Sequence, residues 1–460
     1  MSALLDPETF APAVESDKKF VWRQMMQNHG VEKGEPFVVV RGEGVRVWDA
    51  QGREYLDASS GGVWVVNVGY GRTSIADAVR DQLVTLNYYA ALQGNAPAAL
   101  FAEKLIEKMP GLARVYYSSS GSEANEKVFK MVRQISHRHY GGKKSKILFR
   151  ERDYHGTTFG ALAATGQEQR RAQYGPFPEG FVEVPHCLEY RSQFGAVNDY
   201  GERAAQAIED VVLREGPETV GALCLEPITA GGGAIVPPDG YWPRVQEICR
   251  KYDILLHLDE VVCGLGRTGK WFGYQHFGVE PDFVVLAKGL ASGYAAISCT
   301  VTTEKVFKLF DDDSADPMSY FRDASTFGGC LAGPAAALET LRIVESEGLV
   351  ENAAVMGALM LDKLRALQNG RPQIGDVRGL GLFCGVELVA DPVSRTPLDE
   401  ALVLKIQAEC QRRGVIIGRT NRAMNGMNNT LCLSPPLIIT AEDVERVVAT
   451  LGDAIDHVLQ

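Results

Sequence analysis

Short apolar segments alternate with helix-like patterns between about residues 75 and 330 of this chain. The clearest segments are residues 115–117, 147–149, 221–225, 254–258 and 283–287. They are apolar on both faces, which is typical of strands inside a parallel sheet that is covered by helices. The pattern therefore predicts an α/β fold with a mainly parallel central sheet. In such sheets, ligands bind beyond the carboxyl ends of the strands.

The two ends of the chain have a different pattern. Residues 37–57 predict a hairpin with a glycine-rich turn. The segment 335–460 has a helical pattern at its start, a strand candidate at residues 383–388, and a final helix after Thr440. Thr440 is a suitable N-cap for that helix. The apolar residues on one face of the helix predict packing against a core.

The composition excludes several classes of protein. The 460 residues include 47 Lys plus Arg against 58 Asp plus Glu, for a formal net charge of −11. This balance gives no electrostatic reason to bind nucleic acid or an anionic membrane, and no apolar run approaches the roughly 20 residues that span a bilayer. We expect no secretory signal, because no basic stretch is followed by an apolar one near the N-terminus. The nine cysteines form no CxxC pair, so we expect reduced thiols in the cytoplasm.

The residues after the first apolar segment can bind an anion, and those after the second can stack on a flat ligand. Ser120, Gly121 and Ser122 follow residues 115–117 and precede a helical pattern, so free amides and hydroxyls would face an anion there. The alternative is simple N-capping by Ser122. Tyr154 follows residues 147–149 and can stack on a flat ligand, although packing at the rim of the sheet is the alternative.

The residues after the last three apolar segments are charged. Glu226 and Asp259 each end a fully apolar strand, where an unpaired carboxylate would cost several kcal/mol. No Arg or Lys stands next to either, so we expect a metal, a distant basic residue or a cationic ligand as partner. Lys288 follows residues 283–287, where burial can lower its pKa and make it a nucleophile. A lysine that reaches the surface is the alternative.

Together these residues predict a site for a phosphorylated, planar, cationic ligand that carries a carbonyl group, and pyridoxal 5′-phosphate (PLP) has all four properties. Its phosphate would lie at residues 120–122 and its ring against Tyr154. Asp259 would keep the ring nitrogen protonated, and Lys288 would bond to the aldehyde. A protonated ring accepts the electrons that are released when the substrate C–H bond breaks.

Other functions fit the sequence less well. Residues 264–270 nearly match a phosphate-binding GxxxxGK loop, but Trp271 stands where a Ser or Thr must meet Mg²⁺, and no strand leads into the loop. The same residues spell GxGxxG without an amphipathic helix after them. A metal site on His257, Asp259 and Glu260 is disfavoured, since adjacent strand residues face opposite ways. A non-enzymatic binding protein leaves Lys288 and the acids unexplained.

The motifs resemble those of class III aminotransferases, which share the type I PLP fold. The matching segments are residues 61–64, 121–126, 154–156, 226–227, 259–261, 287–289 and 325–329. The resemblance implies an α/β fold with a large PLP-binding domain over residues 76–334. It also implies a smaller α+β domain that combines an N-terminal segment, 1–75, with a C-terminal part, 335–460.

The same resemblance implies further roles for single residues. His155 and Glu226 would be among the cofactor-binding residues, and Val261 would pack on the ring face opposite Tyr154. Thr326 would reach the phosphate bound by a partner subunit, so the active unit would be a homodimer. The aromatic side chains Trp64, Tyr88 and Tyr89 would line the substrate pocket; core or interface packing is the alternative for these three.

One departure from the family pattern narrows the substrate. Ornithine and 4-aminobutyrate aminotransferases carry Gln-Gly-Glu after the Glu-Pro pair, whereas this chain has residues 229–231 as Thr-Ala-Gly. That resembles the ω-amine:pyruvate branch, in which one arginine binds the acceptor carboxylate; Arg419 is the best candidate, with Arg422 as the alternative.

Residues 18–22 and 428–436 are similar to taurine:pyruvate members in particular. We therefore expect amino transfer from taurine, β-alanine or a similar amine to pyruvate. A 2-oxoglutarate-dependent ω-aminotransferase, an aminomutase or a decarboxylase on the same fold remain alternatives.

Overall fold

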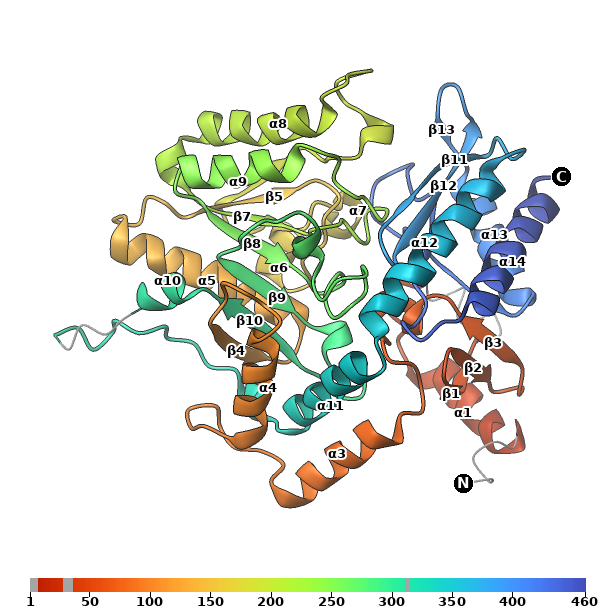
Figure 1. Ribbon diagram of the computed structural model, residues 1–460, viewed down its shortest axis with the longest axis horizontal. Helices are drawn as coiled ribbons and strands as arrows, with labels where there is room; N and C mark the ends of the chain where they lie inside the picture. Colours follow the sequence, from red (N-terminus) through yellow and green to blue (C-terminus); the bar gives the residue numbers. More distant parts are fainter. Residues whose placement is uncertain (1–6, 28–35, 311–314) are drawn as a thin grey trace.

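A computed structural model describes residues 7–27, 36–310 and 315–460 of the protein. Its centre is a seven-stranded sheet with the order β4-β10-β9-β8-β7-β5-β6 (Figure 1). The strands are β4 (Arg114–Ser118), β5 (Lys146–Arg150), β6 (Phe181–Val184), β7 (Val220–Leu225), β8 (Leu255–Asp259), β9 (Phe283–Leu286) and β10 (Ser298–Thr302). All pairs are parallel except the two that β10 forms, which are antiparallel. The predicted mainly parallel sheet is thus confirmed.

Helices cover both faces of this sheet, with α8 and α9 on one side and α5 on the other (Figure 1). Alternate residues of a strand enter the two layers: Leu148 packs with the α8 and α9 side, whereas Ile147 and Phe149 pack with α5. This explains why the strands are apolar on both faces. The helices of this part are α3 (Thr73–Thr85), α4 (Ala96–Ile106), α5 (Gly121–His139), α6 (Phe159–Ala163), α7 (Glu168–Arg171), α8 (Tyr200–Glu215), α9 (Tyr241–Lys251), α10 (Glu304–Lys308) and α11 (Ala332–Ser346).

The two ends of the chain share a second, four-stranded sheet with the order β1-β2-β3-β14. Strands β1 (Val39–Glu43), β2 (Arg46–Asp49) and β3 (Glu54–Asp57) are antiparallel, and β2 follows β1 as the predicted hairpin. Strand β14 (Val415–Ile416) pairs with β3 in parallel, although more than 350 residues separate them. The helix α1 (Pro7–Phe20) lies near these strands in Figure 1.

A third sheet with the order β11-β12-β16-β15 completes the C-terminal part. Its elements are β11 (Ile374–Gly379), β12 (Cys384–Asp391), β15 (Gly418–Arg419) and β16 (Thr430–Leu433), with β13 (Thr396–Pro397) on β12 and with α12 (Leu349–Gln368), α13 (Glu400–Arg412) and α14 (Ala441–Leu459). The predicted strand at 383–388 is β12. The last helix begins after Thr440, whose hydroxyl accepts a hydrogen bond from the N–H of Asp443, so the predicted N-cap is confirmed. The apolar face of α14 lies in the core, as predicted.

Within the described ranges, no helix has both the length and the apolar character that a membrane crossing requires.

Candidate active site

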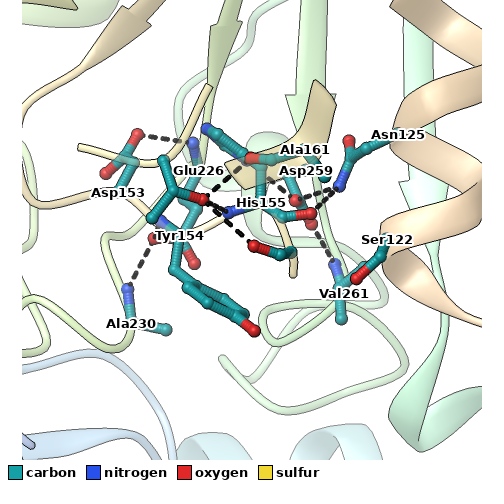
Figure 2. A network of polar contacts seen from close by, with 12 residues as sticks. Ser122, Asn125, Asp153, Tyr154, His155, Ala161, Glu226, Ala230, Asp259 and Val261 are labelled. Carbon is teal, nitrogen blue, oxygen red and sulfur yellow. Dashed lines mark hydrogen bonds and ion pairs between the residues drawn. The ribbon is translucent and has the colours of Figure 1, made fainter. Parts of the chain in front are cut away.

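Residues from the carboxyl ends of the parallel strands meet at one edge of the central sheet (Figure 2). Asp259 is the last residue of β8, and Lys288 stands two residues after β9. Tyr154 and His155 follow β5, and Glu226 follows β7. The predicted groups therefore converge as the topology requires.

Asp259 is buried and fully hydrogen-bonded. Its Oδ2 accepts hydrogen bonds from His155 Nδ1 at 2.9 Å and Asn125 Nδ2 at 2.8 Å, and its Oδ1 accepts one from the N–H of Val261 at 3.0 Å (Figure 2). Burial raises the pKa of Asp259, but the hydrogen bonds from His155 and Asn125 outweigh it and hold that pKa below its ordinary value. The carboxylate thus stays ionised inside the protein, where a cation beside it is strongly stabilised.

Lys288 has a left-handed backbone conformation, with φ of 39°. Its Nζ lies 5.4 Å from the ring centroid of Trp64, and it forms no ion pair with any carboxylate in the described part of the chain. Burial lowers the pKa of Lys288, although the Asp259 and Glu226 charges oppose this effect. A lysine with a lowered pKa supplies the neutral amine that attacks a carbonyl group.

The start of α5 lies where the sequence predicts a cradle for an anion. Ser120, not Ser122, is the N-cap, since its Oγ accepts a hydrogen bond from the N–H of Glu123 at 3.2 Å. The alternative of N-capping by Ser122 was therefore wrong; the Ser122 Oγ instead accepts a hydrogen bond from the N–H of Thr157 at 3.1 Å. A Cβ on Gly121 would lie 3.0 Å from Val261 Cγ2, so a larger residue here would press on Val261.

Glu226 is the second buried carboxylate at the strand ends. Its Oε2 accepts hydrogen bonds from the N–H groups of Tyr154 at 3.2 Å and Ala230 at 3.1 Å. Burial, together with the charges of Asp153 and Asp259, raises the pKa of Glu226 well above its ordinary value. Backbone amides thus take the place of the basic partner that the sequence led us to expect. No cluster of three metal-ligating side chains occurs in the ranges that the structure describes.

The expected substrate-pocket residues occupy two different places. Trp64 lies in the π-helical turn Ser60–Trp64 and packs edge-on against Phe383, with ring centroids 5.6 Å apart. Tyr88 and Tyr89 are 37 % and 52 % exposed in the single chain. They lie against Gly329, close to Thr326, which is also exposed.

The structure distinguishes the two candidate arginines. Arg419 ends β15, and only 10 % of its side chain is exposed; its Nη1 lies 3.1 Å from Glu400 Oε1. Burial lowers the pKa of Arg419, and the charge of Glu400 opposes this. Arg422 is 44 % exposed and lies 3.5 Å from the same oxygen. Arg419 is therefore the inner member of the pair.

The sequence analysis did not predict two polar residues of the site, Asn125 and Arg170. Asn125 links helix α5 to Asp259, and its Nδ2 also donates to the His155 carbonyl oxygen at 2.8 Å. Arg170, in α7, lies over the ring of Tyr154 at 4.9 Å. Helical spacing from Gly121 could have indicated Asn125, whereas nothing near Arg170 in the sequence marks it.

Comparison with known proteins identifies the family of the chain. The family model for "Aminotransferase class-III" matches residues 27–455. The chain belongs to the class III aminotransferase family. It is 64 % identical, over 100 % of its length and 99 % of the relative, to hypotaurine/taurine–pyruvate aminotransferase of Paracoccus denitrificans. It is 54 % identical to taurine–pyruvate aminotransferase of Bilophila wadsworthia, with 98 % of each chain covered.

Solved structures of other aminotransferases have the same fold as this class III member. A Bacillus anthracis aminotransferase superposes with a TM-score of 0.94 at 39 % identity, covering 98 % of this chain and 99 % of that one. An ω-transaminase from Pseudomonas jessenii in complex with PMP gives a TM-score of 0.92 at 34 % identity, with 97 % and 98 % covered. The protein is thus a PLP-dependent aminotransferase with the type I fold.

The chemistry of the residues present fits this cofactor. The ionised Asp259 suits a ring cation, the unpaired Lys288 amine suits an aldehyde, and the open start of α5 suits a phosphate. The start of α5 adjoins the ends of β8 and β9, since a Cβ on Gly121 would lie 3.0 Å from Val261 Cγ2 and 3.7 Å from Ala287 Cβ.

Proposed function

We propose that this enzyme transfers the amino group of taurine, or of a similar small ω-amino acid, to pyruvate, giving an aldehyde and alanine. The observation that carries the proposal is the 64 % identity over the full chain to a hypotaurine/taurine–pyruvate aminotransferase. The site supports it, since a buried acid, a lysine with a lowered pKa and an inner arginine meet the needs of amino transfer to a 2-oxo acid.

Lys288 and Asp259 are the proposed catalytic residues. Bound PLP supplies an aldehyde for the amine and a ring that accepts the electrons of the broken C–H bond. The Lys288 amine removes the proton from the donor carbon and returns it at the neighbouring position, as general base and then acid. Asp259 keeps a negative charge beside the ring nitrogen throughout, held in place by His155 and Asn125.

The other proposed cofactor contacts come from the same edge. Ser120, Gly121 and Ser122 would bind the phosphate at the start of α5, where free N–H groups attract an anion. Tyr154 and Val261 would pack on the two faces of the ring. His155 and Glu226 would act behind these contacts, His155 by holding Asp259 and Glu226 by fixing the backbone of Tyr154.

Arg419 is the proposed group that binds the carboxylate of pyruvate. A guanidinium can bind a carboxylate through two parallel hydrogen bonds. For this, the ion pair between Arg419 and Glu400 must break, because the Glu400 carboxylate occupies Nη1 of Arg419. Trp64 would border the same space beside Lys288.

We further propose a homodimer in the cytoplasm. Thr326 would contact the phosphate bound by the partner subunit, and Tyr88 and Tyr89 would complete the substrate pocket there. The exposure of Tyr89 and of Phe327, at 52 % and 68 %, supports an interface at this position. The absence of disulfides among the nine free cysteines supports a reducing compartment.

A panel of donors and acceptors tests the proposal. Taurine, β-alanine, putrescine and 1-phenylethylamine are each incubated with pyruvate or 2-oxoglutarate, and alanine, glutamate and carbon dioxide are measured. We expect alanine from taurine and pyruvate at the highest kcat/KM. Glutamate as the main product would favour a 2-oxoglutarate-dependent enzyme; carbon dioxide release would favour a decarboxylase. An isomerised donor formed without an acceptor would indicate an aminomutase.

A further inference from the structure

Arg170 is a cation next to Tyr154 that forms no ion pair within the described residues. It lies in α7, and its guanidinium covers the ring of Tyr154 at 4.9 Å. Its Nε donates to Gln167 Oε1 at 2.7 Å and its Nη2 to the Asn421 carbonyl oxygen at 3.0 Å. Its Nη1 has only the Met25 sulfur, at 3.9 Å, a weak acceptor. No carboxylate in the described part of the chain forms an ion pair with it.

The position of Arg170 places it near the reacting groups. Tyr154 directly precedes His155, which holds Asp259, and the charge of Arg170 is among those that lower the pKa of Lys288. Asn421 stands two residues after Arg419, so Arg170 and Arg419 belong to the same wall of the site. Burial lowers the pKa of Arg170 itself. A partly desolvated guanidinium of this kind binds an anion more strongly than an exposed one.

The two arginines differ in whether their charge is already neutralised. Arg419 is paired with Glu400, whereas Arg170 has only neutral partners. Gly231 lies next to Gln167, the partner of Arg170, since a Cβ on Gly231 would lie 3.0 Å from Gln167 Nε2; neither residue carries a charge. Arg170 can therefore bind an anion directly, whereas an anion at Arg419 must first displace Glu400, and the two arginines suit different anions.

We propose that Arg170 binds the sulfonate of the amine donor, while Arg419 serves the acceptor. This inference rests on the proposed function. In taurine the anionic group is on the carbon next to the reacting carbon, whereas the pyruvate carboxylate is bonded directly to the reacting carbon. The two anions thus lie at different distances from Lys288, and two separate cations meet that need. The planar fork of an arginine matches the oxygens of a sulfonate.

The test uses the holoenzyme and two variants that remove or neutralise this cation. Arg170→Met removes the guanidinium. Gly231→Glu keeps Arg170 but places a carboxylate next to its partner Gln167, where it can neutralise the guanidinium charge. The matched control is Arg171→Met, since Arg171 lies on the same short helix but contacts the rings of Phe149 and Phe177. In a two-stage transfer, kcat/KM for each substrate reports only its own half-reaction.

We expect both variants to lower kcat/KM for taurine by about 10- to 100-fold, the effect of losing one or two charge-assisted hydrogen bonds. Both variants should lower kcat/KM for taurine at least about tenfold more than kcat/KM for pyruvate or for 1-phenylethylamine, which has no anionic group, and Arg171→Met should change none of the three. Arg170→Lys should recover part of the loss, because it keeps the charge but not the fork.

A binding measurement separates this inference from the proposed function. Propane-1-sulfonate carries the anion but no amine, so calorimetry with the holoenzyme reports the subsite without turnover. Weaker binding by about 10- to 100-fold in Arg170→Met and Gly231→Glu supports the inference even if taurine is not a substrate. The inference is overturned if the wild type does not bind propane-1-sulfonate, if neither variant weakens that binding, or if the variants impair pyruvate instead of taurine. If Arg170→Met does not fold, Gly231→Glu alone decides between these outcomes.

Discussion

Replacing Asp259 with asparagine removes one charge and keeps the shape of the side chain. The carboxylate accepts two hydrogen bonds at Oδ2, from His155 and Asn125, and one at Oδ1 from Val261. The asparagine side chain has one oxygen and one NH₂ group. Whichever way it is oriented, its NH₂ group faces at least one of the donors that the carboxylate accepted, from His155, Asn125 or Val261. Such an unsatisfied donor costs about 1–3 kcal/mol.

The larger effect concerns the cation that Asp259 is proposed to hold. Breaking a buried ion pair by removing one partner costs about 3–5 kcal/mol, and each 1.4 kcal/mol is a factor of ten. We therefore expect removal of the donor proton to slow by between about 10²- and 10⁴-fold in Asp259→Asn. Some cofactor should remain bound, because Lys288 and the start of α5 are unchanged.

Single-turnover experiments with taurine measure this step directly through the absorbance of the bound cofactor. A donor deuterated at the reacting carbon should show a larger isotope effect in the variant if proton removal has become slower. Asp282→Asn is the matched control, since Asp282 precedes β9 at the opposite end of the sheet and accepts the N–H of Leu256 at 2.9 Å. A rate within threefold of the wild type, with the cofactor bound, would refute the role of Asp259.

Four further outcomes can be measured. Lys288→Ala should abolish turnover, and borohydride should then attach no cofactor mass to the peptide containing residue 288; an active variant would contradict the proposal. Because burial lowers the pKa of Lys288 below 10.5, the pH midpoint of cofactor capture by the apoenzyme should lie below that value; a midpoint at or above pH 10.5 would count against it. Arg419→Met should lower kcat/KM for pyruvate by at least about tenfold and change that for 1-phenylethylamine little; equal losses would reassign the carboxylate contact. Gly357→Ala should destabilise the fold by about 1–3 kcal/mol in denaturant unfolding, since its Cβ would lie 2.2 Å from the backbone of Gly381, whereas Gly94→Ala has open space and should be neutral.

The central sheet could be predicted because most of its strands carry their own signal. Strands β7 and β9 are apolar along their whole length, and in β8 only His257 and Asp259 are polar, since helices cover both faces of the sheet. Strand β10 was missed for a physical reason. It contains Ser298 and Thr300, whose hydroxyls donate to the carbonyl oxygens of Ser120 and Ala124 at 2.8 and 2.9 Å. These partners satisfy buried polar groups that, in the sequence alone, suggest an exposed loop.

The candidate site was predictable to the extent that its residues lie at the end of a strand or just after it. Lys288, Asp259 and Glu226 have this position, so the rule for parallel sheets brings them to one edge. Asn125 and Arg170 lie within helices, and only the packing of α5 and α7 brings them to the site. The N-cap at Ser120 was missed because Ser122, two residues later, offers the same hydroxyl, and only the backbone conformation decides which of them caps α5.

The three arginines of the site, Arg170, Arg419 and Arg422, differ in how far their charge is neutralised by their surroundings. Arg419 and Arg422 share the single carboxylate of Glu400, so this cluster retains one positive charge in excess. Arg170 adds a second, and its neutral partners leave that charge available. On our proposal, a donor with an anionic tail would be attracted to Arg170 before any contact rearranges. An acceptor carboxylate would compete with Glu400 for Arg419. One cation with neutral partners and one that is already paired would then let a single pocket take two unlike substrates in turn.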